Sequence, residues 1–395
     1  MAYTKEEFKQ LVDDIQSQSW YKNPIGFGIA KVDRGQINKD KILQATFPLI
    51  NWNENFGSAA VLLNALKVAG ENLDTSKSEL VCKISDAFLT SCIEAFRPFI
   101  PEAKGDAHKN VQVISTLASL PIDSGLTAED YRVVFIFEDA APESTEAVYL
   151  KLYALSTGKA ALRSLNLNGA FGKLHNCAWV GNQPIELDWL RANEIVLKLS
   201  GKYPNIDFVD KFPRLLQHVI LADNTRILDS GKVRMGAQLA AGTTVMPGAA
   251  YINFNAGTLG SVMVEGRISS SAVVGAGSDV GGGASILGVL SGTDGVPVTI
   301  GENTLLGANS CTGTAIGDGC ILDAGVTILP GTKIALSDKA VEQLKAINPG
   351  KEISNVMKGS DFQGVNGVHF RVNSSTGQTI AMRSTREVKL NADLH

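Results

Sequence analysis

The segment from Val233 to Ile334 repeats with a period of six residues, and this period constrains the fold more than any other feature of the chain. Each hexad has an aliphatic residue, then usually glycine or alanine, then small or polar residues. The clearest aliphatic positions are Ile268, Val274, Val280, Ile286, Ile316, Leu322, Ile328 and Ile334. Neither an amphipathic helix nor an alternating strand has this spacing. It predicts a parallel β-solenoid in which three hexads make one coil of a triangular prism.

The aliphatic side chains are expected to point into the prism, and the small residue after each is expected to tolerate a tight corner. This pattern is typical of the left-handed β-helix of hexapeptide-repeat proteins. Most proteins with this fold are acyltransferases that use coenzyme A. Because fold alone does not establish function, the activity has to be argued from the residues of a site.

Composition narrows the class of protein further. A chain of 395 residues is too long for one ordinary core, so we expect two or three domains. The net charge of −4 disfavours a nucleic-acid partner, and no stretch reaches the roughly eighteen apolar residues of a membrane span. The polar N-terminus shows no signal peptide. Five cysteines without a CxxC pair predict no disulfide framework or zinc site and favour a cytoplasmic location.

The first two segments are predicted from helix and strand signals. Residues 1–104 are expected to be a mainly helical domain, with capping boxes at Thr4–Glu7 and Ser76–Glu79. Four apolar residues at helical spacing follow the second box: Leu80, Ile84, Phe88 and Cys92. Residues 105–225 are expected to be a small α/β domain. Its elements are predicted as strands at 131–137 and 195–199 and helices at about 144–156 and 212–220.

The solenoid is predicted over residues 226–335, and a C-terminal segment over 336–395. This last segment is expected to have a helix at 337–347 and a few strands that cover the open end of the prism, since an end coil exposes strand edges. The fold class is therefore an α/β N-terminal region, a left-handed parallel β-helix and a small C-terminal cap. The hexad is interrupted at 251–265 and at 288–298. We interpret both interruptions as active-site loops, with neutral decoration of the solenoid as the alternative.

Acyl transfer from a thioester to an amine needs a base, donors for the oxyanion and a groove for the coenzyme. No histidine lies between His218 and His369, so the coils supply neither a histidine base nor the three-histidine zinc site of γ-carbonic anhydrases. The base is then a carboxylate or lies outside the coils. Glu265, in the sequence MVEGR, is the candidate; the alternative is a solvated corner carboxylate.

Other motifs carry weaker signals. The glycines of 275–283 have the spacing GxGxxxG and no crossover helix follows, so a dinucleotide loop is disfavoured. They turn corners or let a pantetheine arm approach the backbone. Lys358 and Arg371 could contact coenzyme phosphates, although simple solvation is the usual state of a single surface cation.

The solenoid sequence resembles the tetrahydrodipicolinate N-succinyltransferases of bacterial lysine biosynthesis. The resemblance rests on NFNAGT, MVEGRIS, GSDVGGGASI, LLGAN and the final LNADLH, and it is strong over 226–395. The first 225 residues are similar only in layout, and indicate the longer branch of the family. The resemblance implies transfer of the succinyl group of succinyl-CoA to the amine of ring-opened tetrahydrodipicolinate, in lysine and diaminopimelate biosynthesis.

The resemblance also implies roles for individual residues. Glu265 matches the catalytic glutamate, either as general base or as the carrier of an acyl anhydride; we favour the base because a thioester is already activated. Arg267 lies in the acyl-coenzyme site and is a partner for a carboxylate. The other implied coenzyme contacts are Gly282, Ser285, Ala308, Asp323, Ala324, Gly331, Lys358, Arg371, Val372, Asn373 and Ser374. At Asp323 the family can have glutamate instead.

Succinyl-CoA is implied as a cosubstrate, with no tightly bound cofactor, and the family assembles as homotrimers with sites between subunits. Some members hold magnesium on acidic residues near the three-fold axis. This chain has Lys232 and the sequence MPGAA there, so no metal is predicted. An acetyl-CoA-dependent or sugar-amine acyltransferase on the same fold is the alternative enzyme. A non-enzymatic scaffold is the third reading, and it would neither need MVEGR nor bind coenzyme A.

Overall fold

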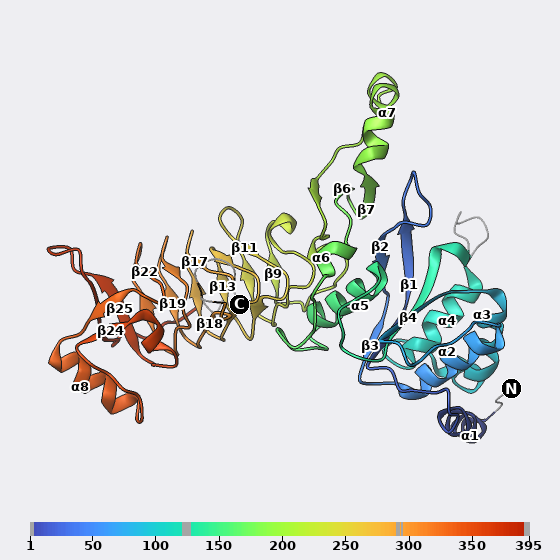
Figure 1. Cartoon of the computed structure of the whole chain (residues 1–395), viewed down its shortest axis with the longest axis horizontal. Helices are drawn as coiled ribbons and strands as arrows, with labels where there is room; N and C mark the ends of the chain where they lie inside the picture. The colour runs from blue at the N-terminus through green and yellow to red at the C-terminus, as the bar shows by residue number, and fades with distance from the viewer. Residues whose placement is uncertain (1–3, 121–127, 290–292, 294, 391–395) are drawn as a thin grey trace. The chain divides into compact units, whose positions relative to one another are not determined.

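The computed structural model describes residues 4–120, 128–289, 293 and 295–390. The chain forms two compact units (Figure 1). Unit 1 comprises Met1–Ala154 and Leu165–Pro213, and unit 2 comprises Leu155–Ser164 and Arg214–His395. No helix of the described residues is long and apolar enough to cross a membrane.

Unit 1 combines helices with two antiparallel sheets. Its helices are α1 (Lys5–Gln16), α2 (Phe56–Val68), α3 (Asp86–Phe96), α4 (Lys109–Ser119), α5 (Thr145–Ser156), α6 (Ala170–Lys173) and α7 (Leu187–Leu199). Its strands are β1 (Gly26–Arg34), β2 (Ile42–Thr46), β3 (Ile50–Trp52), β4 (Glu79–Lys83), β5 (Tyr131–Ile136), β6 (Cys177–Val180), β7 (Gln183–Glu186) and β8 (Phe208–Asp210). The larger sheet has the order β2-β1-β5-β4, with β3 also on β1, and the smaller has the order β7-β6-β8.

Several predictions of local structure in unit 1 are confirmed. Thr4 caps α1, since its hydroxyl accepts from the Glu7 N–H at 3.1 Å and its own N–H donates to the Glu7 carboxylate at 3.1 Å. The strand predicted at 131–137 is β5, and the helix predicted at about 144–156 is α5. These elements were predictable because their signals are local.

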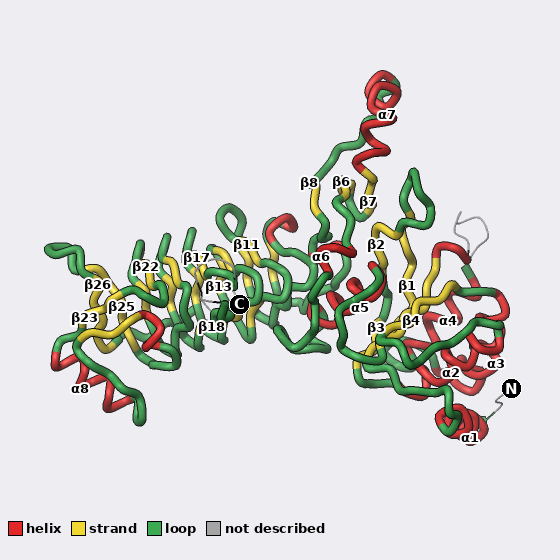
Figure 2. The backbone as a smooth tube through the Cα atoms, in the orientation of Figure 1, coloured by secondary structure: helices red, strands yellow, loops and turns green. Residues whose placement is uncertain are grey.

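Other predictions in unit 1 are wrong (Figure 2). The Ser76–Glu79 pair is no capping box, because Glu79 begins β4, and the next helix is capped by Ser85. Residues 195–199 are the last turns of α7, where the β-branched side chains are exposed and no partner strand pairs with them. Residues 212–220 hold only a 3₁₀ turn at Leu215–Gln217.

Residues 1–104 contain strands of the larger sheet as well as helices, so the prediction of a mainly helical domain is incomplete. Strands β1 to β4 lie among the expected helices, and β5 pairs with both β1 and β4. The sheet therefore crosses the division predicted at residue 104. The core of unit 1 joins side chains of α1 to α4 with those of β1, β4 and β5.

Unit 2 contains the predicted solenoid. Its two-residue strands are β9 (Arg226–Ile227), β10 (Thr244–Val245), β11 (Tyr251–Ile252), β12 (Gly257–Thr258), β13 (Met263–Val264), β14 (Arg267–Ile268), β15 (Val273–Val274), β16 (Asp279–Val280), β17 (Ser285–Ile286), β18 (Thr299–Ile300), β19 (Leu305–Leu306), β20 (Cys311–Thr312), β21 (Ile321–Leu322) and β22 (Thr327–Ile328). They form three parallel sheets, β9-β10-β13-β16-β19-β21, β11-β14-β17-β20-β22 and β12-β15-β18. The second residue of each paired strand points inward, and most of these residues belong to one continuous core. The hexapeptide β-helix is therefore confirmed.

The C-terminal segment closes one end of the coils, as Figure 1 shows. Its elements are β23 (Lys333–Ala335), α8 (Asp338–Ile347), β24 (Val356–Lys358), β25 (Val368–Val372) and β26 (Thr379–Arg383). Strand β25 extends the first parallel sheet beyond β21 and is followed by antiparallel β26. Phe362 and Phe370 are buried in the same core as the coil residues. The predicted helix and strands of this segment are confirmed.

The interruption predicted at 251–265 is wrong. Strands β11, β12 and β13 pair in register with β14, β15 and β16, so this segment is a regular coil. In β12 (Gly257–Thr258), Thr258 occupies the inward position where the hexad normally has an aliphatic residue. The repeat was therefore not recognised in the sequence. The true irregularity comes next, where Val264 and Ile268 are four positions apart instead of six. Of the second interruption, 288–298, residues 290–292 and 294 lie outside the described residues, and so do residues 391–395 at the C-terminus.

Candidate active site

The predicted site residues gather around one face of the prism, the parallel sheet β11-β14-β17-β20-β22, which we call the site face. Its outward row consists of Tyr251, Arg267, Ser285, Cys311 and Thr327. The turns by which the chain enters β14, β17, β20 and β22 form the leading edge of the sheet, at 265–266, 281–284, 307–310 and 323–326. The turns by which it leaves form the trailing edge, which ends with 329–332.

Glu265 lies on the leading edge in an unusually short turn. Only Glu265 and Gly266 separate β13 from β14, whereas four residues separate the corresponding strands of the following coils. The Glu265 N–H donates to the Val280 carbonyl at 2.8 Å, which fixes the backbone against the next coil. Its carboxylate is half-buried, and among the described residues it has no hydrogen-bond or ion-pair partner. A carboxylate in this setting is available to accept a proton from a bound amine.

The short turn depends on Gly266. A Cβ at Gly266 would lie 2.3 Å from the Ala284 carbonyl oxygen, so only glycine allows the two coils to approach this closely. Gly281 and Gly307 are similarly tight, with a Cβ 2.6 Å from the Leu306 oxygen and 2.7 Å from the Leu322 oxygen. The leading edge is therefore largely bare backbone. Such a surface lets an extended ligand chain lie close to peptide groups.

The predicted contacts Gly282, Ala308 and Ala324 follow one another along this edge, one in each successive turn. Gly282 is next to the catalytic candidate, since a Cβ there would be 3.6 Å from the Glu265 Oε2 atom. Ala308 and Ala324 are exposed. The structure thus brings Glu265 and these three residues together on one line.

Arg267 and Ser285 lie side by side in the outward row of the site face. Arg267 is exposed and Ser285 is buried. Cys311, the next residue in the row, was not among the predicted site residues. Burial raises the pKa of the Cys311 thiol, while the charge of Arg267 acts in the opposite direction. Its place in the row follows from the hexad, because Cys311 precedes the inward Thr312 as Arg267 precedes Ile268.

Asp323 and Arg371 meet at the far end of the leading edge. The Arg371 Nε atom lies 3.5 Å from Asp323 Oδ2, and the His369 Nε2 atom lies 2.7 Å from Asp323 Oδ1. His369 was missed by sequence reasoning. The alternation of VHFRV contains the signal, because His369 and Arg371 share one face of β25 while Phe370 points inward.

The next three predicted contacts belong to the hairpin between β25 and β26. Val372 and Ser374 are exposed, and the Asn373 N–H donates to the Gln378 carbonyl at 2.9 Å. The Asn373 side chain accepts from the Ser375 N–H at 3.0 Å. Asn373 thus shapes the hairpin, and its neighbours remain accessible.

Gly331 and Lys358 lie on the trailing edge instead. Residues next to Lys358 hold the turn 329–332, since the Gly359 N–H donates to the Thr332 carbonyl at 2.9 Å and the Ser360 N–H to the Pro330 carbonyl at 3.0 Å. Lys358 is directly opposite Lys333 in the antiparallel pair β23–β24, and both lysines are exposed. The predicted residues therefore flank the site face on both edges.

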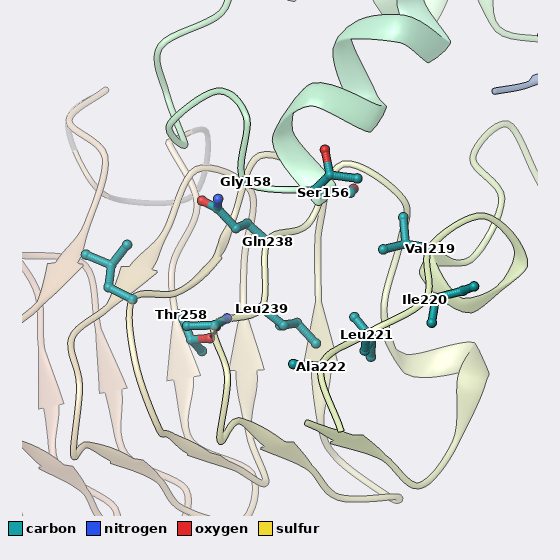
Figure 3. Close-up of a pocket in the computed structure, with 12 residues that line it drawn as sticks. Ser156, Gly158, Val219, Ile220, Leu221, Ala222, Gln238, Leu239 and Thr258 are labelled. Carbon is teal, nitrogen blue, oxygen red and sulfur yellow. Dashed lines mark hydrogen bonds between the residues drawn. The ribbon is translucent and has the colours of Figure 1, made fainter. Parts of the chain in front are cut away.

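Unit 2 also has a cavity of about 430 Å³ away from this face (Figure 3). It is lined by Ser156 to Gly158, Val219 to Ala222, Gln238 to Ala240, Thr258 and Leu259, next to the third sheet. None of the predicted site residues contributes to it. Within the described part of the chain, no group of three or more His, Cys, Asp or Glu side chains could hold a metal ion.

Comparison with known families covers most of the chain. Residues 6–172 match the family model described as tetrahydrodipicolinate N-succinyltransferase N-terminal, and residues 174–214 match its middle part. Residues 297–330 match the hexapeptide repeat of succinyl-transferase. The matches thus extend over both units, and not only over the coils.

Individual relatives are similar over the full length. A 2,3,4,5-tetrahydropyridine-2,6-dicarboxylate N-succinyltransferase of Sulfurovum sp. is 66% identical, over 99% of this chain and 98% of its own. The Campylobacter jejuni protein of the same name is 53% identical over the whole of both chains. A crystal structure from Campylobacter jejuni, provisionally described as a 2,3,4,5-tetrahydropyridine-2-carboxylate N-succinyltransferase, has a TM-score of 0.92 at 53% identity, and covers 98% of this chain and 100% of its own.

Proposed function

The chain belongs to the 2,3,4,5-tetrahydropyridine-2,6-dicarboxylate N-succinyltransferases, and we propose that Glu265 is the catalytic residue with which it carries out the family's reaction. The reaction transfers the succinyl group of succinyl-CoA to the amine of ring-opened tetrahydrodipicolinate, a step of lysine and diaminopimelate biosynthesis. The observation that supports the assignment is the Glu265 carboxylate, which has no partner among the described residues and lies at the start of a glycine-lined edge. The acetyl-CoA, sugar-amine and scaffold alternatives are not favoured.

In the proposed mechanism Glu265 acts as a general base. The acceptor nitrogen attacks the thioester carbonyl carbon, and the Glu265 carboxylate takes the proton that the nitrogen loses. The new C–N bond forms, the C–S bond breaks, and the thiolate leaves and takes up that proton as free coenzyme A. A carboxylate without an intramolecular partner suits this role, because no existing hydrogen bond has to be broken first.

The coenzyme contacts are proposed along the two edges. Arg267 pairs with the succinyl carboxylate, which its planar guanidinium binds at two points. The backbone at Gly282, Ala308 and Ala324 and the side chain of Ser285 accompany the pantetheine arm. Phosphate groups are assigned to Lys358 and Arg371, with Gly331 and the hairpin residues Val372, Asn373 and Ser374 beside them.

The remaining proposals concern the state of the protein. We propose a homotrimer with sites between neighbouring subunits, no metal, and no cofactor beyond the cosubstrate. Exposed aliphatic side chains on unit 2, among them Ile220 and Leu259, fit an assembled state. A cytoplasmic location is supported by the five cysteines, all of which carry free thiols.

A thiol-release assay tests the reaction and the catalytic residue together. Wild type, Glu265→Ala and Glu265→Gln are compared with the tetrahydrodipicolinate acceptor and either succinyl-CoA or acetyl-CoA. We expect release with succinyl-CoA, and a loss of about 10²- to 10⁴-fold in kcat in both variants, since both lack the base. Release with acetyl-CoA alone, or with neither donor in a folded protein, would contradict the proposed function.

A second measurement separates the base from the anhydride. Wild type is mixed with radiolabelled succinyl-CoA without acceptor, quenched in acid and treated with hydroxylamine. A general base leaves no label on the protein. Hydroxylamine-sensitive label that is present in wild type and absent in Glu265→Gln would establish the covalent route instead.

A further inference from the structure

A charged cluster of three residues closes the leading edge of the site face. Asp323 directly follows β21, and β25 pairs with this strand so that His369 is opposite Ile321 and Phe370 opposite Leu322. The alternation of β25 places His369 and Arg371 on the same outward face. Their side chains both reach the Asp323 carboxylate, one at each oxygen.

The two contacts use one carboxylate oxygen each, a hydrogen bond with His369 and an ion pair with Arg371. The His369 Nε2–H donates to Oδ1 at 2.7 Å, since a carboxylate only accepts, and the Arg371 Nε lies 3.5 Å from Oδ2. The side chains of His369, Asp323 and Arg371 are 24%, 38% and 48% exposed, so the exposure rises toward the arginine. Within the described residues Asp323 is the only ion-pair partner of Arg371. The two terminal nitrogens of Arg371 are thus available to a ligand.

The cluster is too far from Glu265 to take part in the chemical step. Three parallel pairings separate the strands that precede Glu265 and Asp323: Val264–Val280, Val280–Leu306 and Leu306–Leu322. At about 4.8 Å per pairing the separation is roughly 14 Å. A proton cannot pass directly over this distance, so His369 and Asp323 are no alternative catalytic dyad. A donor with its thioester at Glu265 and its arm along this edge would bring its phosphate end toward the cluster.

We propose that Asp323 and His369 are positioning residues that hold the Arg371 guanidinium for a phosphate group of the acyl-coenzyme. The inference rests on the proposed function and adds to it His369, which has no other assigned role. The Asp323 carboxylate lies at the Nε side of the Arg371 guanidinium. The remaining N–H groups of this guanidinium form a planar fork that matches a phosphate. His369 fixes the carboxylate, so that the arginine does not sample other rotamers.

The test compares two donors that share the thioester but differ in the phosphate end. Succinyl-CoA and succinyl-pantetheine are assayed with wild type, Arg371→Ala, Asp323→Ala, Asp323→Asn, His369→Leu and His369→Gln. Gln keeps an N–H donor near the position of Nε2, whereas Leu removes it and fits between Ile321 and Met382, the strand neighbours of His369. Binding of coenzyme A and of pantetheine is measured in parallel by calorimetry, which does not depend on turnover.

We expect Arg371→Ala to lower kcat/KM for succinyl-CoA by about tenfold to a hundredfold, the usual effect of a lost charged hydrogen bond. His369→Leu and Asp323→Ala should show a smaller loss of several-fold, and His369→Gln should stay near wild type. With succinyl-pantetheine all variants should match wild type. A merely structural role would lower the values for both donors equally.

Three results would overturn the inference. In the first, Asp323→Ala and His369→Leu retain the full kcat/KM for succinyl-CoA. In the second, their kcat/KM falls by the same factor for succinyl-CoA and for succinyl-pantetheine. In the third, Asp323→Asn binds coenzyme A more tightly than wild type, which would mean that the only effect of the Asp323 charge is to repel phosphate. Failure of the proposed function looks different: wild type would turn over neither donor, while calorimetry would still report whether the cluster binds coenzyme A.

Discussion

At the scale of single residues, one glycine determines where the Glu265 carboxylate lies. The two-residue turn at Glu265 requires Gly266, whose missing side chain leaves room for the Ala284 carbonyl oxygen. The shortening moves Glu265 out of the regular corner pattern of the other coils. A corner carboxylate such as Glu302 instead lies in a full-length turn and is exposed to solvent. The irregular turn is therefore the physical difference between Glu265 and the solvated corner carboxylates.

The lysine pair on the trailing edge gives a prediction at the same scale. Lys333 and Lys358 are directly opposite each other, where like charges repel, and neither forms an ion pair with another described residue. An anion bound between them would relieve this repulsion. We expect Lys333→Ala and Lys358→Ala each to raise KM for succinyl-CoA several-fold, by an effect that weakens as salt increases.

Steady-state kinetics at low and high ionic strength check this expectation, with Lys345→Ala as the matched control. Lys345 is an exposed lysine of α8 and has no place on either edge. A KM for succinyl-CoA that is unchanged in Lys333→Ala would remove that residue from the site. Equal changes in all three variants would indicate only a general effect of net charge.

At the scale of elements, what the sequence predicted depends on how local each signal is. The coil strands and α8 were predicted because hexads and caps span only a few residues. The strands β1 to β4 were not predicted. Strands β1 and β5, for example, pair across about a hundred residues of chain, and the sequence of one strand does not indicate which strand it pairs with. For the same reason the contact between Asp323 and His369, 46 residues apart, was missed although Asp323 was predicted.

The segment Leu155–Ser164 belongs to unit 2 although it lies far from the coils in sequence, and Arg163 binds it to them. The Arg163 Nε donates to the Ser271 carbonyl at 2.6 Å, one terminal nitrogen to the Thr299 hydroxyl at 2.8 Å, and the other to the Val298 carbonyl at 2.5 Å. Arg163 has a φ of +68°, an uncommon value that these contacts support. The segment Leu155–Ser164 is thereby tied to two successive coils.

We expect Arg163→Leu to destabilise the protein by about 2 kcal/mol or more, because charged hydrogen bonds are lost and partly buried acceptors are left unpaired. Urea unfolding followed by circular dichroism measures the change, and Arg191→Leu is the control. Among the described residues, the Arg191 side chain contacts only Asp188, in an exposed ion pair at 2.7 Å, so its loss should cost about 1 kcal/mol at most. Equal stability of the two variants would show that the segment is held by other contacts.

At the scale of the whole molecule, the exposure of the site face fits the proposed homotrimer. Arg267, Lys358 and Arg371 are all exposed, and such cations bind anions weakly while water surrounds them. A neighbouring prism that covers the face would exclude water and strengthen each contact. Closed cyclic assemblies of identical chains are the ordinary way to provide such a neighbour.

The last prediction is therefore that activity requires the homotrimer. Sedimentation velocity should give a mass three times the 41.9 kDa of one chain at assay concentrations. Specific activity should fall on dilution in step with the loss of that species, because each site loses the chain that covers its site face. The fall should be reversed when the diluted protein is concentrated again, which separates dissociation from unfolding. A monomer with full specific activity would contradict shared sites, and would mean that the exposed cations of a single prism are sufficient to bind the donor.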